Sequence, residues 1–196
     1  MARLAIFMDG GYIDALAEFE FGIRVDYRRL SSAIVDEVAR KTPEPVDLLR
    51  TYYYHCLPYQ STPPSSEEMA RFSRMRAFLN ALRRLERFTI REGRLAFRGT
   101  DNLGHPIFQQ KRTDLLLGLD FALLSGKRQI THAAIVTGDS DLLPAMEAAQ
   151  QEGIATWLVH GPRVDSKGDS TYAEELWEAA DERMELTFDL MSSIAR

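Results

Sequence analysis

Short apolar runs alternate with longer amphipathic stretches along the chain, the pattern expected of strands separated by helices. Four runs are too short for helices and predict buried strands: 4–8, 48–56, 133–137 and 156–159. Apolar residues at helical spacing predict the helices: 13–19, 27–40, 67–87, 142–152 and 172–180. This alternation favours an α/β fold in which helices cover both faces of a mainly parallel central sheet, a three-layer α/β/α sandwich.

Two stretches depart from this simple pattern. Residues 113–125 are apolar almost all round, which predicts a helix buried at the centre of the protein. Residues 88–98 hold two β-forming runs on either side of Glu92-Gly93, which predict a small β-hairpin insertion. No repeat or linker divides the chain, so we expect a single domain over residues 1–196.

The composition excludes several classes of protein. With 45% hydrophobic and 27% charged residues, the chain can bury a core, unlike an intrinsically disordered protein. Cys56 is the single cysteine, so no internal disulfide can staple the fold. The longest apolar run near the N-terminus, residues 4–8, is too short for a signal peptide or a membrane span. We therefore expect a cytoplasmic protein that binds no membrane.

Charge is strongly segregated along the chain. Residues 71–112 hold 11 basic and 3 acidic residues, a charge of +8, which leaves −13 for the rest of a chain of net charge −5. Such a segment suits an anionic partner, and it suits a solvated surface equally well. If nucleic acid binds, we expect five basic residues to contact it: Arg76, Arg83, Arg87, Lys111 and Arg112.

Aspartates follow two of the predicted strands. Asp9 comes directly after the first strand, and Asp139 and Asp141 follow the strand at 133–137. Because the carboxyl ends of parallel strands meet at one edge of a sheet, we expect these carboxylates to lie close together. Asp114 stands in the first turn of the predicted helix at 113–125, where simple helix capping is the alternative interpretation.

Converging carboxylates repel one another, so either some of them bind protons or a cation lies between them. The four histidines are scattered and form no zinc-binding pattern with the cysteine. Oxygen ligands of strongly negative charge suit Mg²⁺ or Mn²⁺, which activate water and stabilise the leaving oxygen in phosphodiester cleavage. The basic segment would then hold the backbone of a nucleic acid beside the metal.

Three segments together resemble the NYN domain family of PIN-like ribonucleases, and within it the bacterial LabA-like group. They are Phe7-Met8-Asp9-Gly10-Gly11-Tyr12, Lys111-Arg112-Thr113-Asp114 with Asp120, and Thr137-Gly138-Asp139-Ser140-Asp141-Leu142-Leu143-Pro144. The resemblance implies a PIN-like fold and a ribonuclease that hydrolyses phosphodiester bonds of single-stranded RNA with Mg²⁺ or Mn²⁺. It implies four catalytic, metal-binding acids: Asp9, Asp114, Asp139 and Asp141.

Other residues of these segments are expected to support the acids without binding the metal: Tyr12, Lys111, Asp120, Thr137 and Ser140. Asp120 lies about 240° around the helix from Asp114 and so cannot share its face. Lys111 could neutralise the acids or contact a phosphate. Tyr12 stands where the family most often has Asn, and a phenol lacks the paired donor and acceptor of an amide.

The main alternative is a non-catalytic RNA-binding or regulatory module that retains the NYN fold, which Tyr12 favours. Retention of four mutually repelling acids favours the enzyme. An esterase with Ser140 as nucleophile would need an Asp three residues before a late His, but Trp157 precedes His160 there. A dinucleotide-binding fold would need a third glycine after Gly10-Gly11. A homo-oligomer also stays open, since the hairpin or the basic helix could contact a second copy.

Overall fold

The computed structural model describes residues 1–100, 106–111 and 113–196, with backbone only for residues 94, 96–98, 100 and 106–111. Within these residues the strands form one sheet in the order β4-β3-β2-β1-β5-β6-β7. Six of them run parallel: β1 (Ala2–Asp9), β2 (Val46–Cys56), β3 (Phe88–Thr100), β5 (His132–Val136), β6 (Ala155–His160) and β7 (Glu182–Glu185). The edge strand β4 (Pro106–Lys111) is antiparallel to β3.

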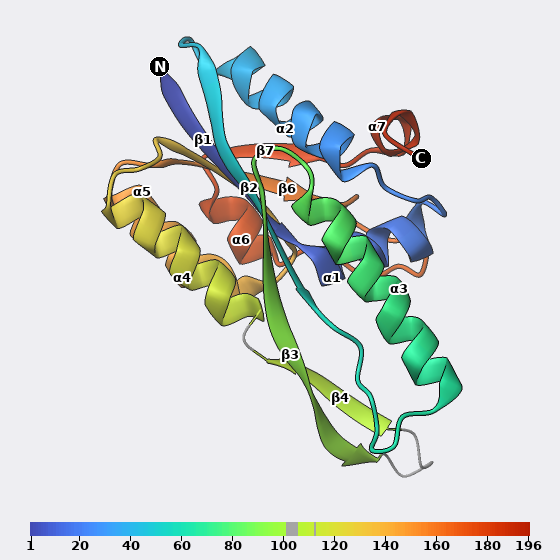
Figure 1. Ribbon diagram of the computed structural model, residues 1–196. Helices are drawn as coiled ribbons and strands as arrows, with labels where there is room; N and C mark the ends of the chain where they lie inside the picture. The colour runs from blue at the N-terminus through green and yellow to red at the C-terminus, as the bar shows by residue number, and fades with distance from the viewer. Residues whose placement is uncertain (101–105, 112) are drawn as a thin grey trace.

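Helices cover both faces of this sheet (Figure 1). One face carries α1 (Gly10–Ala15), a π-helical turn (Leu16–Glu20), α2 (Tyr27–Lys41), α3 (Ser66–Arg83) and α7 (Phe188–Ser193). The other face carries α4 (Thr113–Gly126), α5 (Leu143–Gln151), preceded by a 3₁₀ turn (Ser140–Leu142), and α6 (Glu174–Ala179). The predicted three-layer α/β/α sandwich with a mainly parallel sheet is therefore confirmed.

The central strand β1 explains why the apolar runs in the sequence are continuous rather than alternating. Leu4, Ile6 and Met8 pack into the core on one face, while Ala5 and Phe7 pack into the core on the other. All five side chains are fully buried, because a central parallel strand has a helical layer on each side. Parallel pairing with β2 and β5 brings the carboxyl ends of all three strands to one edge of the sheet.

The sequence predicts a β-hairpin at 88–98 with its turn at Glu92-Gly93, and this position of the turn is wrong. β3 continues straight through Glu92 and Gly93, because both residues still pair in parallel with β2, Gly93 opposite Cys56. Only beyond Gly93 does β3 pair in antiparallel fashion with β4. The hairpin is therefore formed by the far half of β3 and by β4, and it extends past the sheet at the carboxyl edge (Figure 1).

The predicted central burial of the helix at 113–125 is also wrong. α4 lies in an outer layer, so Leu117 and Phe121 pack against the sheet while three leucines on the opposite side of the helix are exposed. The exposed fractions are 71% for Leu115, 50% for Leu119 and 45% for Leu123. We call these three residues the α4 leucine stripe. Among the helices in the described part of the chain, none has the length and apolar character needed to cross a membrane.

Candidate active site

Asp9 is held rigidly where β1 ends and α1 begins. Its Oδ1 accepts hydrogen bonds from the backbone N–H groups of Gly11 (2.9 Å) and Tyr12 (3.2 Å), which caps the helix. Gly10 makes this sharp turn possible: a Cβ there would lie 2.5 Å from the ring of Tyr53 on β2. Oδ2 of Asp9 takes no part in the cap.

The second acidic turn follows β5, the neighbour of β1 in the sheet. Thr137 is fully buried, and its hydroxyl accepts a hydrogen bond from the N–H of Asp139 at 3.2 Å. Asp139 in turn accepts one from the N–H of Asp141 at 3.0 Å and caps the 3₁₀ turn. Thr137 thus supports the acidic turn from beneath, which leaves the side chains of Asp139 and Asp141 exposed at its rim.

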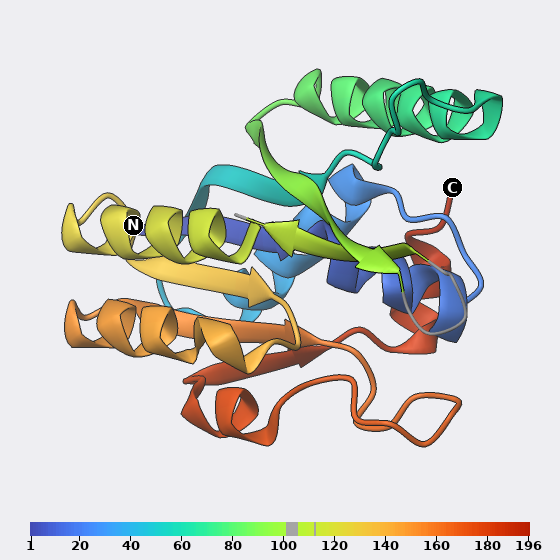
Figure 2. The same ribbon diagram turned by 90° about the horizontal axis from the view of Figure 1, so that it is seen from below.

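Three of the four predicted acids line one pocket. Asp9 from β1, Asp114 from the first turn of α4 and Asp139 from the turn after β5 surround an open pocket of about 440 Å³. The remaining lining residues come from the same turns and from the loop after β6: Gly11, Tyr12, Gly138 and Thr171. The pocket lies at the edge toward which the arrowheads of the parallel strands point in Figure 2. Asp141 is not part of the lining, but its charge acts on Asp114.

Burial and mutual repulsion both act on these carboxyl groups. Burial raises the pKa of Asp9 and the nearby Asp114 raises it further, against the lowering effect of the N–H groups of Tyr12 and Gly11. Burial also raises the pKa of Asp114, and the charges of Asp139 and Asp141 add to that shift. A cluster of this kind is stabilised by a bound proton or by a cation.

The chemistry of these donors fits a hard divalent cation. Among the described side chains, no three Asp, Glu, His or Cys residues converge tightly enough to form a preformed metal cage. Mg²⁺ does not require one, because it retains several of its waters and is commonly bound through one or two carboxylates. Open spacing around Asp9, Asp114 and Asp139 leaves room for such a hydrated ion.

Tyr12 acts as an anchor for the loop that follows β6. Its hydroxyl accepts a hydrogen bond from the N–H of Gly161 at 2.8 Å. Its ring packs against Gly138, where a Cβ would lie 2.8 Å from a ring carbon. The phenol therefore uses its polar atom to hold the loop over the pocket, a contact that an Asn side chain is too short to copy.

His55, which the sequence did not single out, lies close enough to Asp9 to lower the pKa of that carboxyl group. Its Nδ1 lies 2.7 Å from the carbonyl oxygen of Cys56 and its Nε2 lies 3.1 Å from Oδ2 of Asp14. Both partners are acceptors, which favours the protonated imidazole. Burial alone would lower the pKa of His55, but Asp14 and Cys56 outweigh it and raise the pKa, and the charge lowers the pKa of Asp9.

Asp120 lies behind the site and does not line the pocket. It accepts two hydrogen bonds from Arg91, at 2.7 and 3.0 Å, and one from the hydroxyl of Tyr54 at 3.0 Å. This network ties α4 to β2 and β3 and so fixes the helix that carries Asp114. Ser140 lies in the 3₁₀ turn beside Asp139. The side chain of Lys111 and all of Arg112 fall outside the described residues.

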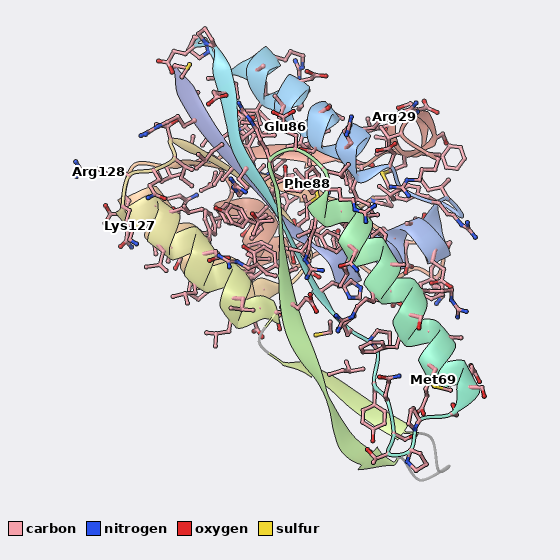
Figure 3. All side chains as sticks on the ribbon, in the orientation of Figure 1. Arg29, Met69, Glu86, Phe88, Lys127 and Arg128 are labelled. Atoms are coloured by element: carbon pink, nitrogen blue, oxygen red, sulfur yellow. The ribbon has the colours of Figure 1, made fainter. Side chains whose placement is uncertain are left out.

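The basic residues of the predicted RNA surface are partly engaged in ion pairs. Arg83 pairs with Glu92, and Arg87 pairs with Asp47 at 2.7 Å. Asp47 lies opposite Arg3, six residues before Asp9 on β1, so Arg87 is roughly 20 Å from the acids along the strand direction. Figure 3 shows its neighbours Glu86 and Phe88 at the turn that leads into β3. Arg76 lies over the ring of Phe72 on α3.

Thr171 and Arg91 contribute to the site although no sequence pattern singled them out. Thr171 reaches the pocket only because the loop after β6 folds back over Gly138, and Arg91 meets Asp120 only because β3 pairs with β2. Both contacts join residues far apart in the sequence. No local signal could have predicted them.

A parallel α/β sheet that gathers aspartates from β1, α4 and β5 at its carboxyl edge defines a fold of the PIN-like nuclease class. The family model for the NYN domain matches residues 3–187, so the chain belongs to the NYN domain family. Nucleases of this fold typically use divalent metal ions, and the family suggests RNA as the substrate. No curated protein matches the chain.

Proposed function

We propose that this protein is a metal-dependent ribonuclease that hydrolyses phosphodiester bonds of single-stranded RNA with Mg²⁺ or Mn²⁺. The observation that carries the proposal is the meeting of Asp9, Asp114 and Asp139 around one open pocket. Their repulsion disfavours the arrangement unless a cation or a proton offsets it, so their retention is best explained by function. Asp141, whose charge acts on Asp114, completes the proposed set.

Each residue has a distinct part in the proposed reaction. Asp9, fixed through Oδ1 by two N–H groups, and Asp139, fixed by its turn, hold the metal and its waters. When bound, the ion lowers the pKa of a water and stabilises the leaving oxygen. Asp114, which lines the same pocket, would also bind the metal, and its raised pKa suits it to accept the proton of the attacking water at a carboxylate oxygen. Thr137 and Tyr12 keep the two acidic turns in place.

The RNA backbone would be held by basic residues outside the pocket. Arg76 and Arg83 belong to α3, and Lys111 is the last residue of β4. These three residues are proposed as phosphate contacts together with Arg112, which lies outside the described residues. Charge reversal at Arg83 should weaken RNA binding and flatten its salt dependence, because fewer counterions are released. The distance of Arg87 from the acids predicts a smaller loss on its reversal.

The test compares cleavage of a labelled single-stranded RNA by the wild type and by Asp139→Asn, with Mn²⁺ or Mg²⁺. Asp36→Asn, an exposed aspartate on α2, is the matched control for loss of one carboxylate. Loss of a metal-binding acid should reduce cleavage at least about 100-fold. Equal activity in wild type and Asp139→Asn would refute the site. Binding without cleavage in the wild type would support the alternative of a non-catalytic RNA-binding or regulatory module.

We also propose that two copies associate through the α4 leucine stripe. A two-fold arrangement would set the α4 leucine stripe of one copy against the same stripe of the other. Burial of these leucines in a dimer would remove an apolar surface that is unusual for a free helix face.

The remaining parts of the assignment rest on the sequence. Membership of the LabA-like group is supported by the three motifs at residues 7–12, 111–114 and 137–144. The composition supports a single cytoplasmic domain over residues 1–196 that binds no membrane.

A further inference from the structure

A second pocket adjoins the acidic pocket. It has a volume of about 230 Å³ and shares two lining residues with the acidic pocket, Tyr12 and Thr171. The two pockets therefore meet at Tyr12 and Thr171. A chain molecule bound at the acids would therefore enter the second pocket with its next unit.

The second pocket presents an aromatic ring and a cation side by side. Phe19 lies on the π-helical turn and is 64% exposed. Nζ of Lys167, from the loop after β6, lies 5.3 Å from the centre of the Phe19 ring. A solvent-exposed aromatic ring beside a flexible cation is the pairing that nucleic-acid-binding proteins use to stack a base and contact its phosphate.

Both side chains stand on supported backbone. The carboxylate of Glu20, next to Phe19, accepts a hydrogen bond from the N–H of Ser166 at 2.8 Å, which ties the loop to the π-helical turn. Within the loop, Asp165 accepts hydrogen bonds from the N–H groups of Lys167 and Asp169. The loop projects as the orange hairpin at the lower right of Figure 2. The backbone that carries the ring and the cation is thus held beside the acidic pocket before any ligand binds.

We propose that Phe19 and Lys167 form a subsite for an unpaired nucleobase of the RNA strand, next to the phosphodiester bond at the aspartates. This inference rests on the proposed ribonuclease function and deepens it. The base stacks on the exposed ring of Phe19, and Lys167 moves to the phosphate that joins this nucleotide to the scissile position. Because a paired base cannot reach an aromatic ring, the subsite selects single-stranded RNA, with little preference among bases.

The chain offers a matched control for the aromatic contact. Phe188, at the start of α7, is 63% exposed, almost the same as Phe19. It lines neither the acidic pocket nor the pocket beside it. Replacement of either ring by Ala removes the same exposed surface, but only Phe19 should matter for RNA.

The experiment measures binding of a labelled single-stranded RNA by fluorescence anisotropy in the Asp139→Asn background, where cleavage is expected to be lost. Phe19→Ala should weaken binding roughly 5- to 150-fold, the range measured for loss of one stacked base. Phe188→Ala should change it less than about twofold, and Phe19→Trp should restore it. Lys167→Gln should reduce the slope of log affinity against log salt by about 0.7, the value for one phosphate of a single strand.

An RNA with an abasic nucleotide at one position sharpens the test. When the missing base is the one that stacks on Phe19, the protein with Phe19 and the Phe19→Ala variant should bind this RNA with the same affinity. If the wild type binds and cleaves RNA but Phe19→Ala binds as well as its parent, the subsite is refuted and the ribonuclease stands. If the wild type neither binds nor cleaves, both proposals fail. A thermal melt of Phe19→Ala that matches the parent excludes misfolding as the cause of a loss.

Discussion

Gly138, between the buried Thr137 and the exposed Asp139, lies where a single methyl group should displace the wall of the acidic pocket. A Cβ at this position would collide with the backbone carbonyl oxygen of Thr171 and lie 2.8 Å from the ring of Tyr12. The carbonyl group of Thr171 cannot simply rotate away, because the loop is tied to Gly138 two residues further on. There the N–H of Ala173 donates a hydrogen bond of 3.0 Å to the carbonyl oxygen of Gly138. Gly138→Ala must therefore move the loop after β6.

The expected cost follows from these contacts. Overpacking of a well-packed site costs about 1–3 kcal/mol, and weakening of the bond to Ala173 adds about 1 kcal/mol. The substitution also restricts the unfolded chain, which returns up to about 1 kcal/mol. The net loss in the free energy of unfolding is then about 1–4 kcal/mol. With a urea dependence of about 2 kcal/mol/M, the midpoint should fall by about 0.5–2 M.

Urea unfolding of wild type, Gly138→Ala and Gly126→Ala measures this directly. Gly126, at the end of α4, has no atom within 4 Å of a Cβ built on it. Gly126→Ala should therefore leave the midpoint unchanged or raise it, by up to about 1 kcal/mol in free energy. A Gly138→Ala midpoint at or above that of the wild type would refute the argument that Thr171 and Tyr12 pack closely over this turn.

Three further predictions concern the residues around the site. Tyr12→Phe leaves the N–H of Gly161 without its partner and should lower the free energy of unfolding by about 1–2 kcal/mol; unchanged urea unfolding would contradict the anchor role. Burial and acidic neighbours raise the pKa of Asp114 above its value in the unfolded chain. In EDTA, the protonated carboxyl group therefore favours the folded state at acid pH, and this stabilisation is lost as the pH rises from the ordinary aspartate pKa through the raised one. In EDTA, Asp114→Asn should then raise the melting temperature at pH 7 but not at acid pH. Added Mn²⁺ should raise the melting temperature of the wild type more than that of the variant. A variant that is less stable than the wild type at pH 7 in EDTA would refute the repulsion. Leu119→Lys, at the centre of the α4 leucine stripe, should convert a dimer to a monomer by light scattering, whereas a wild type that is monomeric at high concentration would refute the interface.

The spacing of apolar residues predicted most of the strands and helices that form the three layers. Five consecutive apolar residues at 4–8 indicated a strand buried on both faces, and the aspartate after it indicated the active edge. The helix predicted at 27–40 was confirmed, and Asp26 caps its start through contacts within three residues of sequence. The strand β7 and the helix α7 were not predicted, since both are short and each owes its place to the core rather than to its own pattern.

The errors came from contacts that no local pattern contains. Glu92-Gly93 was interpreted as a turn, but pairing with β2 keeps β3 extended there. The apolar helix at 113–125 was expected to be central, but it lies in an outer layer and the leucines on one side of it are exposed. In both cases the deciding interaction joins segments that lie far apart in the chain.

The amino-acid sequence by itself determined the alternation of strands and helices, the family motifs and the placement of aspartates at the ends of elements, because these follow from the spacing of neighbouring residues. Only the tertiary structure decided which of those acids share a pocket, that Tyr12 holds the loop after β6, and that Phe19 and Lys167 stand beside the site. The reason is geometric: strand order and loop return set these distances, and neither is written in any short stretch of the chain.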